Sequence, residues 1–133
     1  MGTSLRHPIA TQGFTVIELL VVLAALALLL SVAAPRYIQH LDKAREVTLK
    51  QDLRQMRDAI DKFYNDQGRY PESLSELVER SYLRSIPVDP VTDRADTWVA
   101  VPPKNSSQQD KGVFDVRSGA QDRASDGSSY ANW

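Results

Sequence analysis

The residues best suited to chemistry are oxygen-bearing side chains in the polar segment 118–128. Calcium takes about six to eight hard oxygen ligands, including backbone carbonyls, at about 2.3–2.6 Å. The segment therefore offers oxygens of the kind that calcium binds, although EF-hand spacing is absent and Arg123 places a positive charge among the candidate ligands. The alternative is a solvated loop held by packing of Tyr130 and Trp133. The candidate ligands are Ser118, Asp122, Ser125 and Asp126.

Catalytic chemistry has little support elsewhere in the chain, and we expect a protein that is not an enzyme. There is no cysteine, which excludes thiolate chemistry and cysteine metal sites. His7 lies close to the N-terminus and His40 stands alone, so no Ser–His–Asp set can be argued. No phosphate-binding loop is present. A formal net charge of −1 argues against nucleic-acid binding through bulk charge.

A second residue of chemical interest is Glu18, which lies near the start of a long apolar segment. Leu19 to Leu30 is an unbroken apolar run. As a helix, residues 14–34 would be about 32 Å long, which matches a hydrocarbon core of about 30 Å. An acid in such a segment costs roughly 2.5–3.5 kcal/mol on insertion scales, so a partner for Glu18 is expected.

Three interpretations of this segment are open. It can be a secretory signal cleaved near Ser31-Val32-Ala33, a plain transmembrane anchor, or a segment in which Glu18 has a function. The stretch before it carries Arg6 and His7 and no acid, which favours a cytoplasmic N-terminus and an outward-facing remainder. Three cations on the far side oppose this orientation, and these are Arg36, Lys43 and Arg45.

The elements that position these residues begin with one long helix. Pro35 lacks the N–H of a helix interior and predicts a kink, local melting or a simple helix boundary. Beyond it, apolar residues recur mostly three and four apart, which predicts an amphipathic continuation over residues 35–67. The helix would run from Phe14 to about Gln67, roughly 80 Å. The apolar positions are Ile38, Leu41, Val47, Leu49, Leu53, Met56, Ile60, Phe63 and Tyr64.

Residues 68–133 predict a small head domain of helix, strands and a C-terminal loop. Gly68 is a good residue to end the long helix. Ser73 predicts the cap of a short helix over Leu74 to Arg80, with Glu76 completing a capping box.

Two strands are predicted in this domain, over residues 97–101 and 112–118. They would form a small antiparallel sheet packed on the long helix, because an isolated hairpin is only marginally stable. The fold class expected is therefore α+β, with two or three strands. The helix residues expected under the sheet are Leu53, Met56, Ile60 and Phe63.

The segment from Gly13 to Val22, followed by Pro35, resembles the class III signal of type IV pilins and pseudopilins. The resemblance implies that a prepilin peptidase cuts between Gly13 and Phe14 and methylates the new amino group of Phe14. Residues 1–13 would be a cytoplasmic leader and residues 14–34 a transmembrane and filament-core helix. The mature chain would then keep 120 of the 133 residues.

The rest of the chain resembles the protein G-like major pseudopilins of type II secretion, which implies a pilin-like fold. It further implies an inner-membrane subunit with a periplasmic head, a homopolymeric pseudopilus that acts as a piston, and a bound calcium ion. Its partners would be the prepilin peptidase, an assembly platform, minor pseudopilins and membrane lipid, with no nucleic acid. The matching positions are Tyr64, Gly68 to Pro71, Leu74, Leu77, Tyr82-Leu83, Ile86-Pro87, Asp89-Pro90, Val113 to Ala120, Asp126-Gly127 and Asn132-Trp133.

The resemblance also implies a role for Glu18. If helices stack with an axial stagger, Glu18 of one subunit meets the Phe14 amino group of its neighbour. The pair would specify register, because a wrong register leaves a charge unpaired in low dielectric. Pro35 would allow local loosening of the helix on assembly. Two alternatives remain: a type IV or competence pilus subunit, and a membrane-anchored periplasmic domain that does not polymerise.

Overall fold

The computed structural model describes residues 2–4, 13–104 and 111–133. Arg6 and His7, on which the expected cytoplasmic orientation rests, lie outside these residues. The chain divides into two compact units, Met1–Ile38 and Gln39–Trp133.

The helix α1 (Val16–Gln67) is continuous over 52 residues and contains Pro35. Of the alternatives given for Pro35, a simple helix boundary is therefore wrong. Proline leaves the Ser31 carbonyl without its helical donor, while the Ser31 hydroxyl donates to the Ala27 carbonyl at 2.7 Å. The side chains of residues 14–34 are all exposed. By length and composition this helix is apolar enough to cross a membrane.

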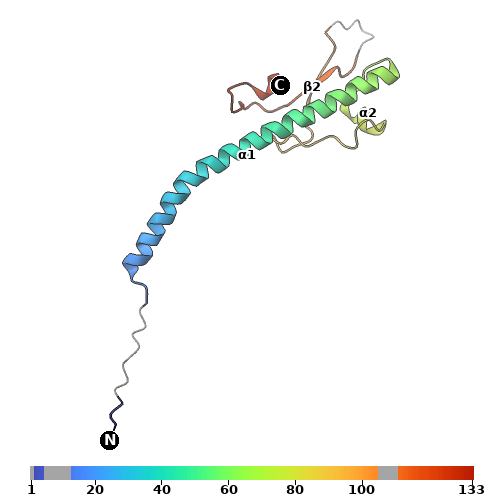
Figure 1. Cartoon of the computed structure of the whole chain (residues 1–133). Helices are drawn as coiled ribbons and strands as arrows, with labels where there is room; N and C mark the ends of the chain where they lie inside the picture. Colours follow the sequence, from blue (N-terminus) through green and yellow to red (C-terminus); the bar gives the residue numbers. More distant parts are fainter. Residues whose placement is uncertain (1, 5–12, 105–110) are drawn as a thin grey trace. The chain divides into compact units, whose positions relative to one another are not determined.

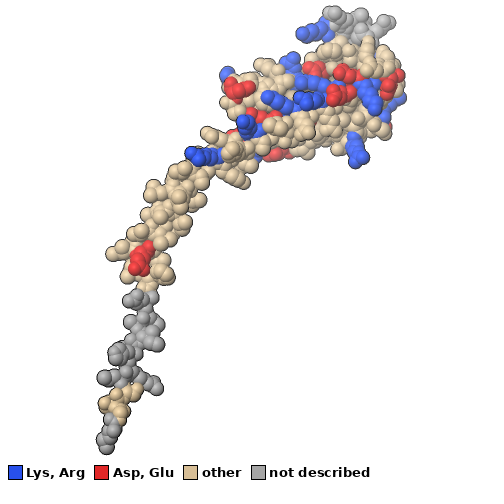
Figure 2. Space-filling view, viewed as in Figure 1, with Lys and Arg blue, Asp and Glu red and all other residues tan. Residues whose placement is uncertain are grey.

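In the second unit, α1 provides one face of the core (Figure 1). Its buried positions alternate in spacing between three and four residues, as expected for a helix with one apolar stripe. The apolar members of this stripe are Leu49, Leu53, Met56, Ile60 and Phe63, each at most 1% exposed. Charged side chains of both signs lie over the outside of this unit (Figure 2).

The end of α1 and the short helix that follows are close to prediction. Gly68 has φ +71° and its N–H donates to the Tyr64 carbonyl at 2.8 Å. The helix α2 (Leu74–Glu79) is capped by Ser73, whose hydroxyl accepts from the Glu76 N–H at 3.4 Å.

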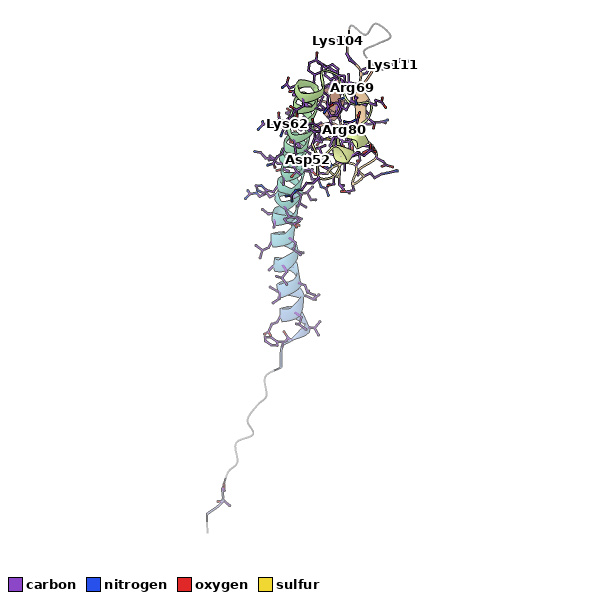
Figure 3. All side chains as sticks on the ribbon, turned by 90° about the vertical axis from the view of Figure 1, so that its right-hand side faces the viewer. Asp52, Lys62, Arg69, Arg80, Lys104 and Lys111 are labelled. Atoms are coloured by element: carbon purple, nitrogen blue, oxygen red, sulfur yellow. The ribbon has the colours of Figure 1, made fainter. Side chains whose placement is uncertain are left out.

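The Glu76 carboxylate does not return to the Ser73 N–H as a capping box requires. It accepts from the Glu72 N–H at 2.7 Å and pairs with Arg69 at 2.6 Å. Arg80 lies 3.6 Å from the same carboxylate, so Arg69 and Arg80 both lie beside α2 (Figure 3). The Glu76 carboxylate thus pairs with the nearby Arg69 instead of the Ser73 N–H.

The strands β1 (Val99–Val101) and β2 (Asp115–Arg117) pair antiparallel with Ala100 opposite Val116. Both are shorter than predicted, and within the described ranges they make a two-stranded sheet. Val116 is fully buried and joins the core formed on α1. The helix therefore supplies the apolar face that a short hairpin lacks.

Gly119 lies very close to the backbone of Thr97. A Cβ built on Gly119 would lie 2.0 Å from the Thr97 carbonyl oxygen, so the backbones must separate if any side chain is added. Gly119→Ala should lower the free energy of unfolding by about 1–3 kcal/mol, as overpacking does. Urea unfolding of the full chain in detergent measures this change. Gly127→Asn is the control, because Gly127 faces open space and asparagine tolerates its φ of +84°. Equal stability of Gly119→Ala and the parent would contradict the close approach.

Candidate functional site

The first candidate site is the beginning of α1, where Thr15 and Glu18 form a reciprocal pair. The Glu18 N–H donates to Thr15 Oγ1 at 3.2 Å, and the Thr15 N–H donates to Glu18 Oε2 at 3.3 Å. This is a capping box, which satisfies two of the N–H groups that a helix start leaves unpaired. This contact was not predicted, although Thr15-Val16-Ile17-Glu18 has the spacing of a capping box.

Gly13 and Phe14 precede this helix and are accessible. Both are exposed, Phe14 by 84%, and neither is helical. Among the described residues, and apart from Gly13 and its chain neighbours, no heavy atom lies within 4 Å of a Cβ built on Gly13. The bond between them therefore lies in non-helical, exposed chain, and the Glu18 carboxylate binds the backbone nitrogen of the very next residue, Thr15.

The second candidate site is the C-terminal loop, residues 118–133, which a carboxylate of α1 contacts directly. Glu46 is 8% exposed and lies three residues before Leu49 on the buried stripe of α1. Its oxygens accept from the Ser125 N–H at 2.6 Å, the Ser125 hydroxyl at 2.7 Å and the Tyr130 hydroxyl at 3.2 Å. All three donors belong to the loop, so Glu46 joins α1 to residues far away in the chain.

These contacts determine the ionisation of the group. Burial alone would raise the pKa of Glu46, but the hydrogen bonds from the Ser125 N–H, the Ser125 hydroxyl and Tyr130 together lower it below its usual value. Burial, with the adjacent Glu46 charge, raises the pKa of Tyr130 to about 12. Glu46 therefore acts as a charged acceptor and Tyr130 as a neutral donor at physiological pH.

Ser118, a predicted calcium ligand, lies in a different polar cluster. It is 1% exposed, and its hydroxyl donates to Oδ2 of the fully buried Asp89. The other Asp89 oxygen accepts from the Val91 N–H at 2.8 Å. Burial, and then repulsion from Asp89, raises the pKa of Asp52, which projects from α1 (Figure 3). Ser118 thus fixes the loop after Asp89 to the segment that follows β2.

The remaining predicted ligands have separate surroundings. Asp126 Oδ1 accepts from the Ser128 N–H at 2.9 Å and from its hydroxyl at 2.6 Å, and these two bonds lower the pKa of Asp126. Asp122 lines an open cavity of about 300 Å³ together with Arg45 and Arg123.

These four residues do not fit a calcium shell. Two of them, Ser118 and Ser125, donate their hydroxyls to protein carboxylates. Asp126 stabilises its own turn, and Asp122 lies beside two arginines. Among the residues that the structure describes, no group of three or more His, Cys, Asp or Glu side chains could hold a metal ion. Calcium binding stays a prediction made from the sequence.

Arg57 provides a second contact between α1 and the C-terminal residues. Its Nε donates to Asp115 Oδ1 at 2.7 Å, and its Nη2 donates to the carbonyls of Val116 at 3.1 Å and Trp133 at 2.6 Å. The Trp133 ring lies 5.0 Å from that of Tyr130, and the Lys50 ammonium lies 4.4 Å from its centre. The expected packing of Tyr130 with Trp133 is thus present.

The chain is similar to known proteins. Residues 36–132 match the model of the family described as type II secretion system (T2SS), protein G. The match begins just after Pro35, so the apolar segment lies outside it. No solved structure matches the chain significantly.

Several curated proteins are similar to half of the chain or more. The type II secretion system core protein G of Pseudomonas aeruginosa is 30% identical, over 59% of this chain and 67% of its own. The protein of the same name from Klebsiella pneumoniae is also 30% identical, over 59% and 68%. The type IV major pilin protein PilA of Myxococcus xanthus is 29% identical, over 50% of this chain and 30% of its own. The fold, with its long helix and small antiparallel sheet, is that expected of a pilin-like protein, and the chain belongs to the protein G family of the type II secretion system.

Proposed function

We propose that this chain is the structural subunit of a periplasmic pseudopilus that acts as a piston in type II protein secretion. The observation that supports the proposal best is the exposure of every side chain of residues 14–34, in a chain whose residues 36–132 match the protein G family. A surface of this kind is unstable in water, since each buried Å² of apolar area contributes about 25 cal/mol. Membrane lipid covers it before assembly, and neighbouring helices cover it in the filament.

Processing precedes assembly in this proposal. The prepilin peptidase cuts the exposed bond between Gly13 and Phe14 on the cytoplasmic face, and methylates the new amino group. Residues 14–34 then hold the subunit in the inner membrane, with the head in the periplasm. The assembly platform and minor pseudopilins act on the processed subunit, and an ATPase elsewhere in the system supplies the work. The chain itself performs no catalysis and binds no nucleic acid.

Glu18 determines the register in the filament. In its own subunit the carboxylate bonds the Thr15 N–H, which satisfies a backbone group and leaves the negative charge unneutralised. A charge in an apolar surrounding is costly unless a counter-charge is present. The Phe14 amino group of a neighbouring subunit supplies that counter-charge. Pro35, within α1, lets the helix loosen locally as subunits pack.

A second candidate function is that of a type IV pilus subunit, which the similarity to the Myxococcus xanthus pilin favours. The two functions differ in phenotype. Deletion of the gene for this chain abolishes protein secretion in the first case, and removes surface pili in the second.

The cleavage site gives a prediction for the N-terminus. In its native host the mature chain should begin with N-methylated Phe14, as intact-mass spectrometry would show. Gly13→Leu should block processing because a bulky side chain precedes the cut bond, and Gly13→Ala should slow it much less. Gly2→Leu, a matched change earlier in the leader, should be processed normally. A mature chain beginning at Ala34, or still carrying Met1 or Gly2, would refute the proposed site.

A prediction about Glu18 separates its two roles. Glutamine can replace glutamate in a capping box but carries no charge. If the charge pairs between subunits, both Glu18→Ala and Glu18→Gln should reduce filament yield at least about tenfold, because an unpaired Phe14 ammonium costs more than about 1.4 kcal/mol. Electron microscopy and sedimentation of sheared filaments measure the yield.

The control for this experiment is Glu72→Gln, which removes an exposed charge from the head and should assemble normally. The melting temperature of the head should be equal in all four proteins, including the parent. A normal filament yield for Glu18→Gln, with a poor one for Glu18→Ala, would leave only the capping role.

A further inference from the structure

The C-terminal loop, residues 118–133, has little regular structure of its own to hold it in place. It contains an isolated bridge between Arg123 and Ser129 and a single turn of 3-10 helix at Tyr130–Asn132. Its buried apolar residues are Ala120, Ala124 and Tyr130, of which two are small. A segment of this composition needs polar contacts to be ordered, because apolar burial alone does not offset the entropy of fixing it.

Glu46 supplies these contacts at the centre of the loop. Both of its oxygens accept from loop donors, and the two shortest bonds, 2.6 and 2.7 Å, come from the N–H and hydroxyl of one residue, Ser125. Tyr130, one turn later in the loop, adds a third. Glu46 is 8% exposed, and both of its carboxylate oxygens are engaged by donors of the protein itself.

Three protein cations lie among the acids around this loop and oppose the entry of a divalent cation. Arg45 and Arg123 line the same cavity as Asp42, Glu46 and Asp122. Lys50 lies close enough to Asp126 to help lower the pKa of that carboxyl. A cation entering among Asp122, Ser125 and Asp126 would therefore meet three protein cations, and would also have to take Ser125 from Glu46.

We propose that the Glu46 carboxylate fastens the C-terminal loop to α1 and takes the place of a metal ion, so that the head keeps its native fold without bound calcium. The proposal is independent of filament assembly, because every contact that carries it lies within one chain. It assigns a positioning function to a residue on the apolar stripe of the helix.

The test uses the full chain in detergent, melted with EGTA or with millimolar calcium, together with hydrogen exchange of its backbone amides. The melting temperature of the parent should be the same in both solutions. Glu46→Gln turns an amide NH₂ toward the Ser125 donors and should lower it by about 5–15 °C. In EGTA the Ser125 amide should be protected in the parent and exchange at least about tenfold faster in Glu46→Gln, which tests the loop directly.

Asp42→Asn is the matched control. Asp42 lines the same cavity from the preceding turn of α1, and its substitution removes the same charge. It should change the melting temperature by less than about 4 °C. Ser125→Ala is the milder variant in case Glu46→Gln does not fold, and it too should speed exchange in residues 118–133. A rise of several degrees with calcium that is lost in Asp122→Asn would overturn the proposal. So would an unchanged exchange rate of the backbone amide at position 125 in both the Glu46→Gln and the Ser125→Ala chains.

Discussion

The side chains of residues 14–34 are exposed on every side of their helix, and water is a poor solvent for almost all of them. This constraint decides where the chain can exist. By length and composition the segment could cross a membrane, and nothing in the described part of its own chain covers it. The capping box of Thr15 and Glu18 follows from it too, because backbone N–H groups at the start of an apolar helix have few other acceptors.

The part of α1 after Ile38 has the opposite character, because it is the scaffold on which the head is assembled. One stripe buries the core, and two polar residues on α1, Glu46 and Arg57, reach the C-terminal segment. The sheet is too short to be stable alone, and the loop after it is mostly irregular. The head therefore depends on α1 for both its apolar and its polar contacts.

Much of this fold could be predicted from the sequence because the signals are local. The apolar run and its periodic continuation predicted the long helix, Gly68 predicted its end, and each predicted strand includes the observed one. Family resemblance, in the segment from Gly13 to Val22 and in the head, indicated the protein G family that the match over residues 36–132 established.

The site contacts were predicted less well because they join distant parts of the chain. Ser125 and Glu46 are 79 residues apart, and no pattern pairs them. One signal was available: Glu46 lies three residues before Leu49 on a stripe whose other members are apolar, and an acid there needs buried partners. Ser118 and Asp126 are close in sequence but contact different partners, since the Ser118 hydroxyl donates to Asp89.

The contacts of Arg57 bear on how this family diverges. Its Nη2 binds main-chain carbonyls at Val116 and Trp133, and such oxygens are present whatever side chain those positions carry. Glu46 likewise takes one of its bonds from the main chain at Ser125. Amino-acid replacement along the C-terminal segment therefore leaves these acceptors and donors in place. Two relatives can share the geometry of this segment while an alignment of their residues there records almost no agreement.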